Sequence, residues 1–229
     1  MEILDKEIQY FIKTPFLLLC MLFALIVFLV HRRRLDKKGR FVGFIVFLYS
    51  FTSILTSQLA LFNVYSTWIY NIMYMPLSFT ILILFKGNDV DFFSFNRSNI
   101  LFLVVSLLHI VNMIFFQGII YIATVTMMLF QLFNAVMAFF YLKNRLENYD
   151  EPVHKNLLNW VAFAVIIDNI VSIPTTALWS KEMFELIGAD QFYFLIEVQM
   201  FLYACWYLII AFGILWNTTS LSSRFSSSS

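Results

Sequence analysis

The sequence predicts an all-α protein, a polytopic transmembrane bundle of seven helices. Of its 229 residues, 61% are hydrophobic and 13% are charged, whereas soluble domains are about half apolar and about a quarter charged. The apolar residues also form repeated runs of roughly 18–25, the length that crosses about 30 Å of hydrocarbon. A third observation, the distribution of lysine and arginine, predicts the side of the membrane on which each connection lies.

The apolar runs define seven spans in a single transmembrane domain, residues 1–216. The spans are residues 10–31, 41–62, 66–86, 99–117, 119–143, 156–179 and 191–216. The fourth and fifth are separated only by Gln117 and Gly118, so one long bent helix would leave six spans. We favour seven, because residues 99–143 are too many for one crossing and glycine favours a tight turn. A disordered, Ser-rich tail is expected at 217–229.

Lysine and arginine predict the orientation of the chain. The connection after span one, "HRRRLDKKGR", carries six of them, and alternate connections with the tail bring the total to twelve of 15. The other side has only Lys6, Lys13 and Lys181. The positive-inside rule therefore places the N-terminus outside and the C-terminus in the cytoplasm, in the cell's inner (cytoplasmic) membrane. The acidic start "MEILDKE" is untypical of a cleaved signal peptide, so span one should remain as an anchor.

The stretch "AVIIDNIVSIP" predicts a polar site near the middle of the membrane. It places Asp168, Ser172 and Thr175 on one helical face, just before a proline. An ionised aspartate at the bilayer centre costs about 2.5–3.5 kcal/mol. His109 is the one cationic candidate at that depth. Three states are open to Asp168: a neutral acid bonded to a neighbouring helix, a pair with protonated His109, or a polar cavity with water, a cation or a ligand.

Other spans add polar side chains to this candidate site. His109, Gln131 and Asp168 lie at similar depths, and Gln199 shares a face of span seven with Trp206. The candidate ligand-binding or proton-coupled residues are Asp168, His109, Gln131, Asn134, Asn112, Glu197, Gln199 and Trp206. The simpler alternative is that the amides and the histidine join helices, and that Trp206 is ordinary packing.

The motifs exclude several classes of protein. HExxH, CxxC, GxSxG and P-loop patterns are absent, and only His109 of the three histidines lies in the interior of a span. We therefore expect no enzyme, no catalytic residue, no metal and no cofactor. Retinal proteins need a lysine in the last span, which has none, and no proline here is followed by glutamine as in the seven-helix sugar transporters. Cys20 and Cys205 are expected to be apolar fillers.

The stretches "LFNVYSTWIYNIMYMPLSFTILILF", "WVAFAVIIDNIVSIP" and "IAFGILW" carry one resemblance. Over most of its length, the chain resembles a group of small bacterial seven-helix integral membrane proteins with no settled activity. The resemblance implies the same topology and a bacterial membrane, and it implies no chemistry.

These observations favour a membrane-embedded sensory or accessory module. It would bind a small molecule, a lipid or a proton in a cavity among spans three to seven and act through a membrane or cytoplasmic protein partner. One alternative is a small-solute or proton-coupled transporter, and a second is a structural subunit of a membrane complex. The lipid bilayer is an expected partner, a homo-oligomer is compatible with the sequence, and nucleic acid is not expected, because topology explains the basic loop.

Overall fold

A computed structural model describes residues 15–61, 67–86, 95–116, 123–148, 152–177 and 189–226. Those ranges contain seven α-helices and no strand. The helices are α2 (Pro15–His31), α3 (Lys37–Leu61), α4 (Thr67–Lys86), α5 (Phe95–Val111), α6 (Thr124–Asn148), α7 (Leu157–Ala177) and α9 (Ala189–Ser226). A π-helical turn, η1 (Asn112–Phe116), follows α5, and a 3-10 turn, η2 (Val153–Lys155), precedes α7. Each predicted span corresponds to one helix, so the all-α prediction is confirmed.

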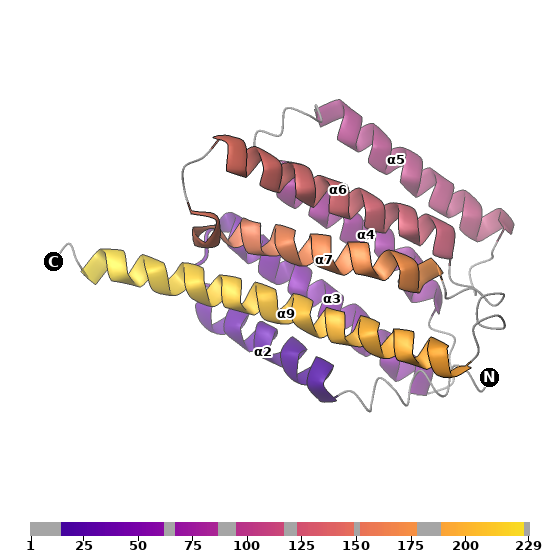
Figure 1. Ribbon diagram of the computed structural model, residues 1–229, viewed down its shortest axis with the longest axis horizontal. Coiled ribbons are helices and arrows are strands. Elements are labelled where there is room, and N and C mark those ends of the chain that lie inside the picture. Colours follow the sequence, from indigo (N-terminus) through magenta and orange to yellow (C-terminus); the bar gives the residue numbers. More distant parts are fainter. Residues whose placement is uncertain are drawn as a thin grey trace.

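The division between the fourth and fifth spans falls where the sequence is least clear. Helix α5 ends at Val111, continues as the π-turn to Phe116, and α6 begins at Thr124. These are two helices that lie side by side in Figure 1, not one long bent helix. The count of seven is therefore confirmed, although α6 begins and ends five residues later than predicted.

The last helix is longer than the sequence suggests. The expected tail starts at residue 217, whereas α9 runs for 38 residues to Ser226. Nothing in "NTTSLSSRFS" breaks a helix, since it contains neither proline nor glycine. The hydroxyls of Thr218 and Thr219 donate back to carbonyls three and four residues earlier, which satisfies them within the helix. Residues 227–229 of the expected tail lie outside the described ranges.

Five helical segments of the described residues are long and apolar enough to cross a membrane. They are Lys37–Leu55, Arg97–Phe116, Thr124–Glu147, Leu157–Ala177 and Glu197–Thr219. Two shorter apolar helical segments, Phe16–His31 and Asn71–Phe85, complete the bundle. Length and composition thus support a multi-pass membrane protein.

Six of the helices form a closed ring, and the seventh lies outside it. Around the ring, α9 packs against α7, α7 against α6, α6 against α4, α4 against α3, α3 against α2, and α2 returns to α9. Helix α5 packs on the outside, against α4 and α6, at the upper edge of the bundle in Figure 1. Any cavity in the ring is consequently enclosed by α2, α3, α4, α6, α7 and α9.

Glycines let two pairs of neighbouring helices approach closely. A side chain at Gly43 of α3 would collide with the ring of Phe28 on α2. A Cβ at Gly213 of α9 would lie 2.7 Å from the Cβ of Trp160 on α7. Small residues at helix crossings are typical of membrane bundles, because backbones then pack directly against side chains.

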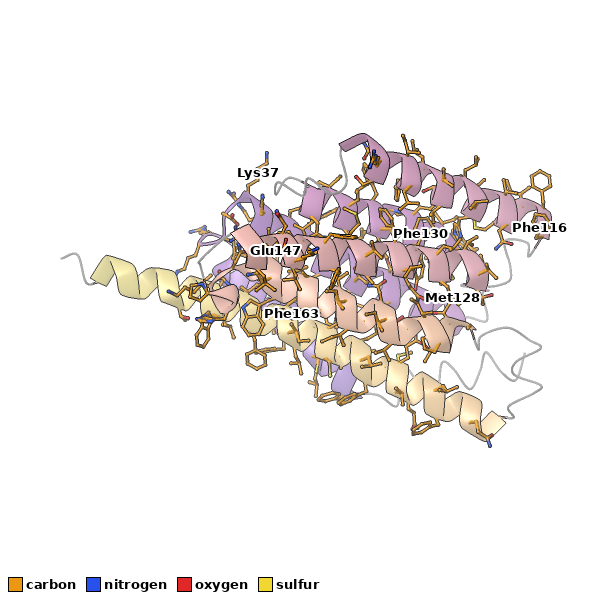
Figure 2. All side chains as sticks on the ribbon, turned by 45° about the horizontal axis from the view of Figure 1, so that its top comes forward. Lys37, Phe116, Met128, Phe130, Glu147 and Phe163 are labelled. Atoms are coloured by element: carbon orange, nitrogen blue, oxygen red, sulfur yellow. The ribbon has the colours of Figure 1, made fainter. Side chains whose placement is uncertain are left out.

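The outside of the bundle is apolar along its length and charged at one end. Phe163 of α7 and Phe116 of η1 are both exposed, and every helix exposes leucine, isoleucine or phenylalanine side chains. Lys37 and Glu147 lie toward one end of the bundle and Phe116 toward the other (Figure 2). The antiparallel course places the starts of α3, α5 and α7 at the charged end, which we call the basic end.

Candidate functional site

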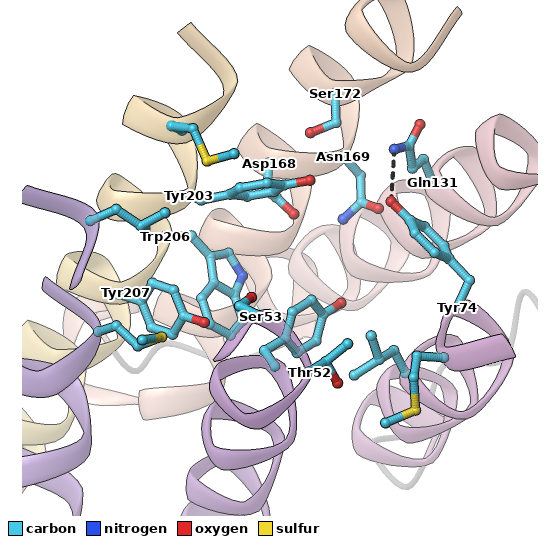
Figure 3. Close-up of a pocket in the computed structure, with 16 residues that line it drawn as sticks. Thr52, Ser53, Tyr74, Gln131, Asp168, Asn169, Ser172, Tyr203, Trp206 and Tyr207 are labelled. Carbon is cyan, nitrogen blue, oxygen red and sulfur yellow. Dashed lines mark hydrogen bonds between the residues drawn. The ribbon is translucent and has the colours of Figure 1, made fainter. Parts of the chain in front are cut away.

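A cavity lies inside the six-helix ring, on the side of Asp168 away from the basic end. Every ring helix contributes to it, and α5 does not. Its polar and aromatic lining residues, drawn in Figure 3, are Tyr49, Thr52, Ser53, Tyr74, Gln131, Asp168, Asn169, Ser172, Tyr203, Trp206 and Tyr207. Leucines and methionines complete the lining, among them Leu17 and Met21 of α2. The cavity has a volume of about 80 Å³, enough for a few water molecules.

Asp168 reaches this cavity from the middle of α7. Its residue is only 9% exposed, and its Oδ1 atom has no hydrogen-bond partner in the described part of the chain. Ser172, one turn further along α7, lines the same cavity with an unpartnered Oγ. Helix α7 continues through Pro174, which cannot donate to the carbonyl of Ile170.

Gln131 of α6 supplies a third unpartnered oxygen. Its Nε2 donates to the hydroxyls of Tyr74 at 3.2 Å and Thr176 at 2.8 Å, and the first of these bonds is drawn in Figure 3. Its Oε1 is buried and has no partner among the described residues. The two donated bonds hold the amide so that its carbonyl oxygen stays available. One cavity is therefore lined by three residues that have an unpartnered carboxylate, amide carbonyl or hydroxyl oxygen.

Aromatic rings from α3 and α9 form the opposite wall. The ring centroids of Tyr49 and Trp206 are 5.0 Å apart, and Trp206 packs edge-on against Tyr207 at 4.9 Å. Tyr207 accepts a hydrogen bond from Ser50 at 3.4 Å. Tyr203 is held from behind by Gln199, whose Nε2 donates to its hydroxyl at 2.8 Å. The wall thus combines π-faces with hydroxyl groups.

A second polar layer lies behind the cavity, between α4, α6 and α7. Asn134 of α6 donates through Nδ2 to Ser78 at 3.1 Å and to Asn169 at 3.5 Å. Asn169 donates in turn to the carbonyl of Val165 in its own helix. These contacts join the helices that carry Gln131 and Asp168.

His109 belongs to a different polar cluster, where α5 meets α4 and the start of α6. Its Nε2 lies 2.7 Å from the carbonyl oxygen of Asn71, which can only accept, so Nε2 carries a hydrogen. Its Nδ1 lies 2.7 Å from the hydroxyl of Thr126. Asn112 also donates to that hydroxyl at 3.3 Å, and Asn71 accepts from the backbone N–H of Ala123 through Oδ1.

The structure divides the predicted site residues into four groups. Asp168, Gln131 and Trp206 line the cavity. Asn134 and Gln199 support residues of its lining. His109 and Asn112 lie together in the α4–α5–α6 cluster, and both ring nitrogens of His109 are bonded there, so it forms no pair with Asp168. Glu197 is exposed on α9 and does not line the cavity.

Several lining residues were absent from the predicted set, although the sequence contains signals for them. Tyr49, Thr52 and Ser53 form a polar stripe on α3, and Ser172 lies four residues after Asp168. Their helical spacing marks them as neighbours on one face. Spacing does not reveal that α3 faces α7, or that α2 belongs to the ring while α5 does not. The cavity was expected among spans three to seven, whereas spans one and two also line it and span four does not.

The described residues contain no cluster of three or more His, Cys, Asp or Glu side chains that could hold a metal ion. Both cysteines are free thiols, with Cys20 buried and Cys205 half-buried. Comparison with protein families, curated proteins and solved structures finds no match to this chain. The resemblance to bacterial seven-helix proteins stays a prediction.

Proposed function

We propose that this protein is an integral membrane sensory or accessory module whose ring cavity takes up a proton or a small cation at Asp168. The observation that carries the proposal is that Asp168, Gln131 and Ser172 all line one cavity, and that each has a buried oxygen without a partner in the described residues. Buried polar atoms are nearly always hydrogen-bonded. Three residues with such an exception on one cavity favour a species that supplies donors or positive charge.

The chemistry of the lining favours a cation over an anion. Carboxylate and amide oxygens accept hydrogen bonds and coordinate hard cations. The aromatic wall around Tyr49 and Trp206 adds ring faces that attract cations, ammonium groups in particular. At about 80 Å³ the cavity is far below the roughly 300–1,000 Å³ of pockets for drug-sized molecules. A proton with water, Na⁺, ammonium or methylammonium therefore suits it better than a lipid.

We place the basic end in the cytoplasm, with the N-terminus outside and the C-terminus inside, in a bacterial inner membrane. The support is the excess of lysine and arginine in connections that lie at one end of the bundle. The cavity would then lie toward the outer half of the membrane and the partner would bind at the cytoplasmic end.

The α6–α7 pair is the proposed route from cavity to partner. Gln131 and Asp168 lie on these two helices, which pack along their length. The end of α6 and the start of α7 both lie at the basic end. There the Trp160 indole donates to the carbonyl of His154 at 3.0 Å, and His154 packs edge-on against Trp216 of α9. A shift of α7 on cation binding would thus be transmitted to the turn at η2.

A transport function is less well supported by the same cavity. Toward the basic end the ring interior is filled by buried apolar side chains, including Val46, Leu82, Ala138, Val165 and Ile210. A carrier needs a polar route to each face in turn, and this packing offers none on that side. A purely structural subunit would not explain why three residues with an unpartnered buried oxygen line the same cavity.

Infrared difference spectroscopy of the protein in phosphatidylcholine nanodiscs tests the proposal. Adding sodium, ammonium or methylammonium at fixed pH, or changing the pH, should alter the carboxyl band of Asp168. The change should disappear in Asp168→Asn and persist in Glu197→Gln, the matched control for an acid outside the cavity. A carboxyl band that responds to neither cation nor pH would contradict the proposal and favour a structural subunit.

Flux measurements in proteoliposomes separate a sensor from a carrier. We expect no uptake of the cation that changes the infrared spectrum. Uptake that is abolished by Asp168→Asn and retained by Glu197→Gln would instead make the protein a transporter.

A further inference from the structure

A second concave site lies at the basic end, well away from Asp168. It has a volume of about 480 Å³, within the usual range for small-molecule sites. Its walls come from the α2–α3 turn, the residues between η2 and α7, and the end of α9. The polar lining residues are Arg34, Asp36, Lys38, Lys155, Asn156 and Asn217.

The charge of this pocket is positive. Three cationic side chains and one carboxylate line it, which gives a net charge of +2. The carboxylate is already used, because Asp36 Oδ1 accepts the backbone N–H of Gly39 at 2.7 Å and caps the start of α3. Neither Arg34 nor Lys155 forms a salt bridge with any of the described residues.

The pocket walls are held in place by contacts that do not involve the cationic groups. Leu35 is buried beside Arg34 and anchors the α2–α3 turn in the core. The opposite wall is fixed by the Trp160–His154 hydrogen bond and by the packing of His154 against Trp216. The cationic side chains of both walls therefore line a pocket that is already formed. This lowers the entropic cost of binding an anion.

Two helices begin at this pocket and add to its positive potential. Helix α3 starts beside Asp36, and α7 starts after Asn156, whose Oδ1 accepts the backbone N–H of Leu158 at 2.9 Å. Helix N-termini carry a partial positive charge. The field of both helices therefore has the same sign as that of Arg34 and Lys155.

We propose that this pocket binds the phosphate group of an anionic ligand, either a phospholipid headgroup or a soluble phosphate compound. Arg34 offers a planar fork of donors suited to two phosphate oxygens, and Lys155 offers a compact charge from the other wall. The pocket lies at the ends of membrane-spanning helices, where a headgroup would reach it from the surrounding bilayer. This proposal stands independently of the cation site at Asp168.

Titration of the purified full-length protein in a neutral detergent tests the proposal. The ligands are dioctanoyl phosphatidylglycerol, dioctanoyl phosphatidylcholine as the zwitterionic control, and inorganic phosphate. The readouts are the melting temperature and the number of lipids retained in native mass spectrometry. We expect phosphatidylglycerol to bind saturably and to raise the melting temperature more than phosphatidylcholine does.

Variants of exposed side chains locate the binding. Arg34→Gln and Lys155→Gln should each weaken phosphatidylglycerol binding about fivefold, and the double variant about 30-fold. Arg97→Gln is the matched control, because it removes an exposed positive charge at the same end of the bundle, on α5, outside the pocket. Circular dichroism and the melting temperature without ligand should be unchanged in all variants.

The titration with inorganic phosphate distinguishes a lipid headgroup from a soluble phosphate compound. Stabilisation by inorganic phosphate that the double variant abolishes would indicate a soluble ligand, whereas a response to phosphatidylglycerol alone would indicate a lipid. Equal losses in Arg97→Gln and the pocket variants would overturn the proposal, because binding would then be diffuse surface attraction. Equal stabilisation by the zwitterionic lipid would overturn it as well.

Discussion

Two buried polar regions of the bundle differ in how completely their polar atoms are hydrogen-bonded. Around His109, on the outside of the ring, both imidazole nitrogens are bonded at 2.7 Å and the amide of Asn71 holds the start of α6. Around Asp168, inside the ring, three oxygens have no partner in the described residues. A closed network joins helices, whereas an open set of acceptors is suited to a ligand. Burial alone does not distinguish the two, since His109 and Gln131 are 0% and 2% exposed.

The largest effect is expected from His109→Leu, which breaks the closed network. The change removes two hydrogen bonds and leaves the Asn71 carbonyl and the Thr126 hydroxyl buried beside an apolar side chain. We expect the free energy of unfolding to fall by about 2–3 kcal/mol. Denaturation in mixed micelles measures this, with His31→Leu at the end of α2 as the control. A smaller loss than that of Asp168→Asn would reverse the comparison.

Gly213→Ala should deform the cavity without touching the network. The new Cβ would lie 2.7 Å from Trp160 Cβ and 3.1 Å from Leu157 Cδ1, so α9 must move away from α7. A loss of about 1–3 kcal/mol is expected, together with a changed cation response at Asp168. Thr219→Ala, exposed on the same helix, is the control for substitution in α9. Unchanged stability and an unchanged infrared response would show that the helix crossing is not tight there.

Asp168→Asn should change stability little while abolishing the response of the cavity. Asparagine has nearly the same shape as aspartate, and Asp168 Oδ1 has no hydrogen bond to lose within the described residues. We expect unfolding free energies within about 1 kcal/mol of the parent, or slightly higher, since a buried acid is replaced by a neutral group. Destabilisation as large as that of His109→Leu would mean that the carboxyl group joins helices.

The smallest effect is expected from Ser172→Ala. Its hydroxyl oxygen is buried without a partner, so its removal costs no hydrogen bond and we expect a change within about 0.5 kcal/mol. The matched substitution in the closed network, Thr126→Val, removes a hydroxyl that contacts His109 and should cost about 1 kcal/mol more. Equal losses for the two hydroxyls would remove the distinction between the regions.

The sequence by itself determined the number and type of the elements. Hydrophobic length fixes where a chain can cross a membrane, and each of the seven runs became a helix, including the pair divided only by Gln117 and Gly118. The cost of a carboxylate in such a run likewise singled out Asp168, which lines the cavity. Both inferences depend on properties that are local to one segment.

The tertiary structure decided which polar faces meet. Asp168 and His109 lie at similar depths in their spans, yet α7 belongs to the ring and α5 lies outside it, so they fall in separate regions. Likewise, Arg34 and Lys155 form one pocket only because the α2–α3 turn lies beside the start of α7. Helical periodicity gives the direction of a side chain around its own axis. It carries no information about neighbours, because in a membrane bundle these depend on close packing between helix surfaces that are mostly apolar.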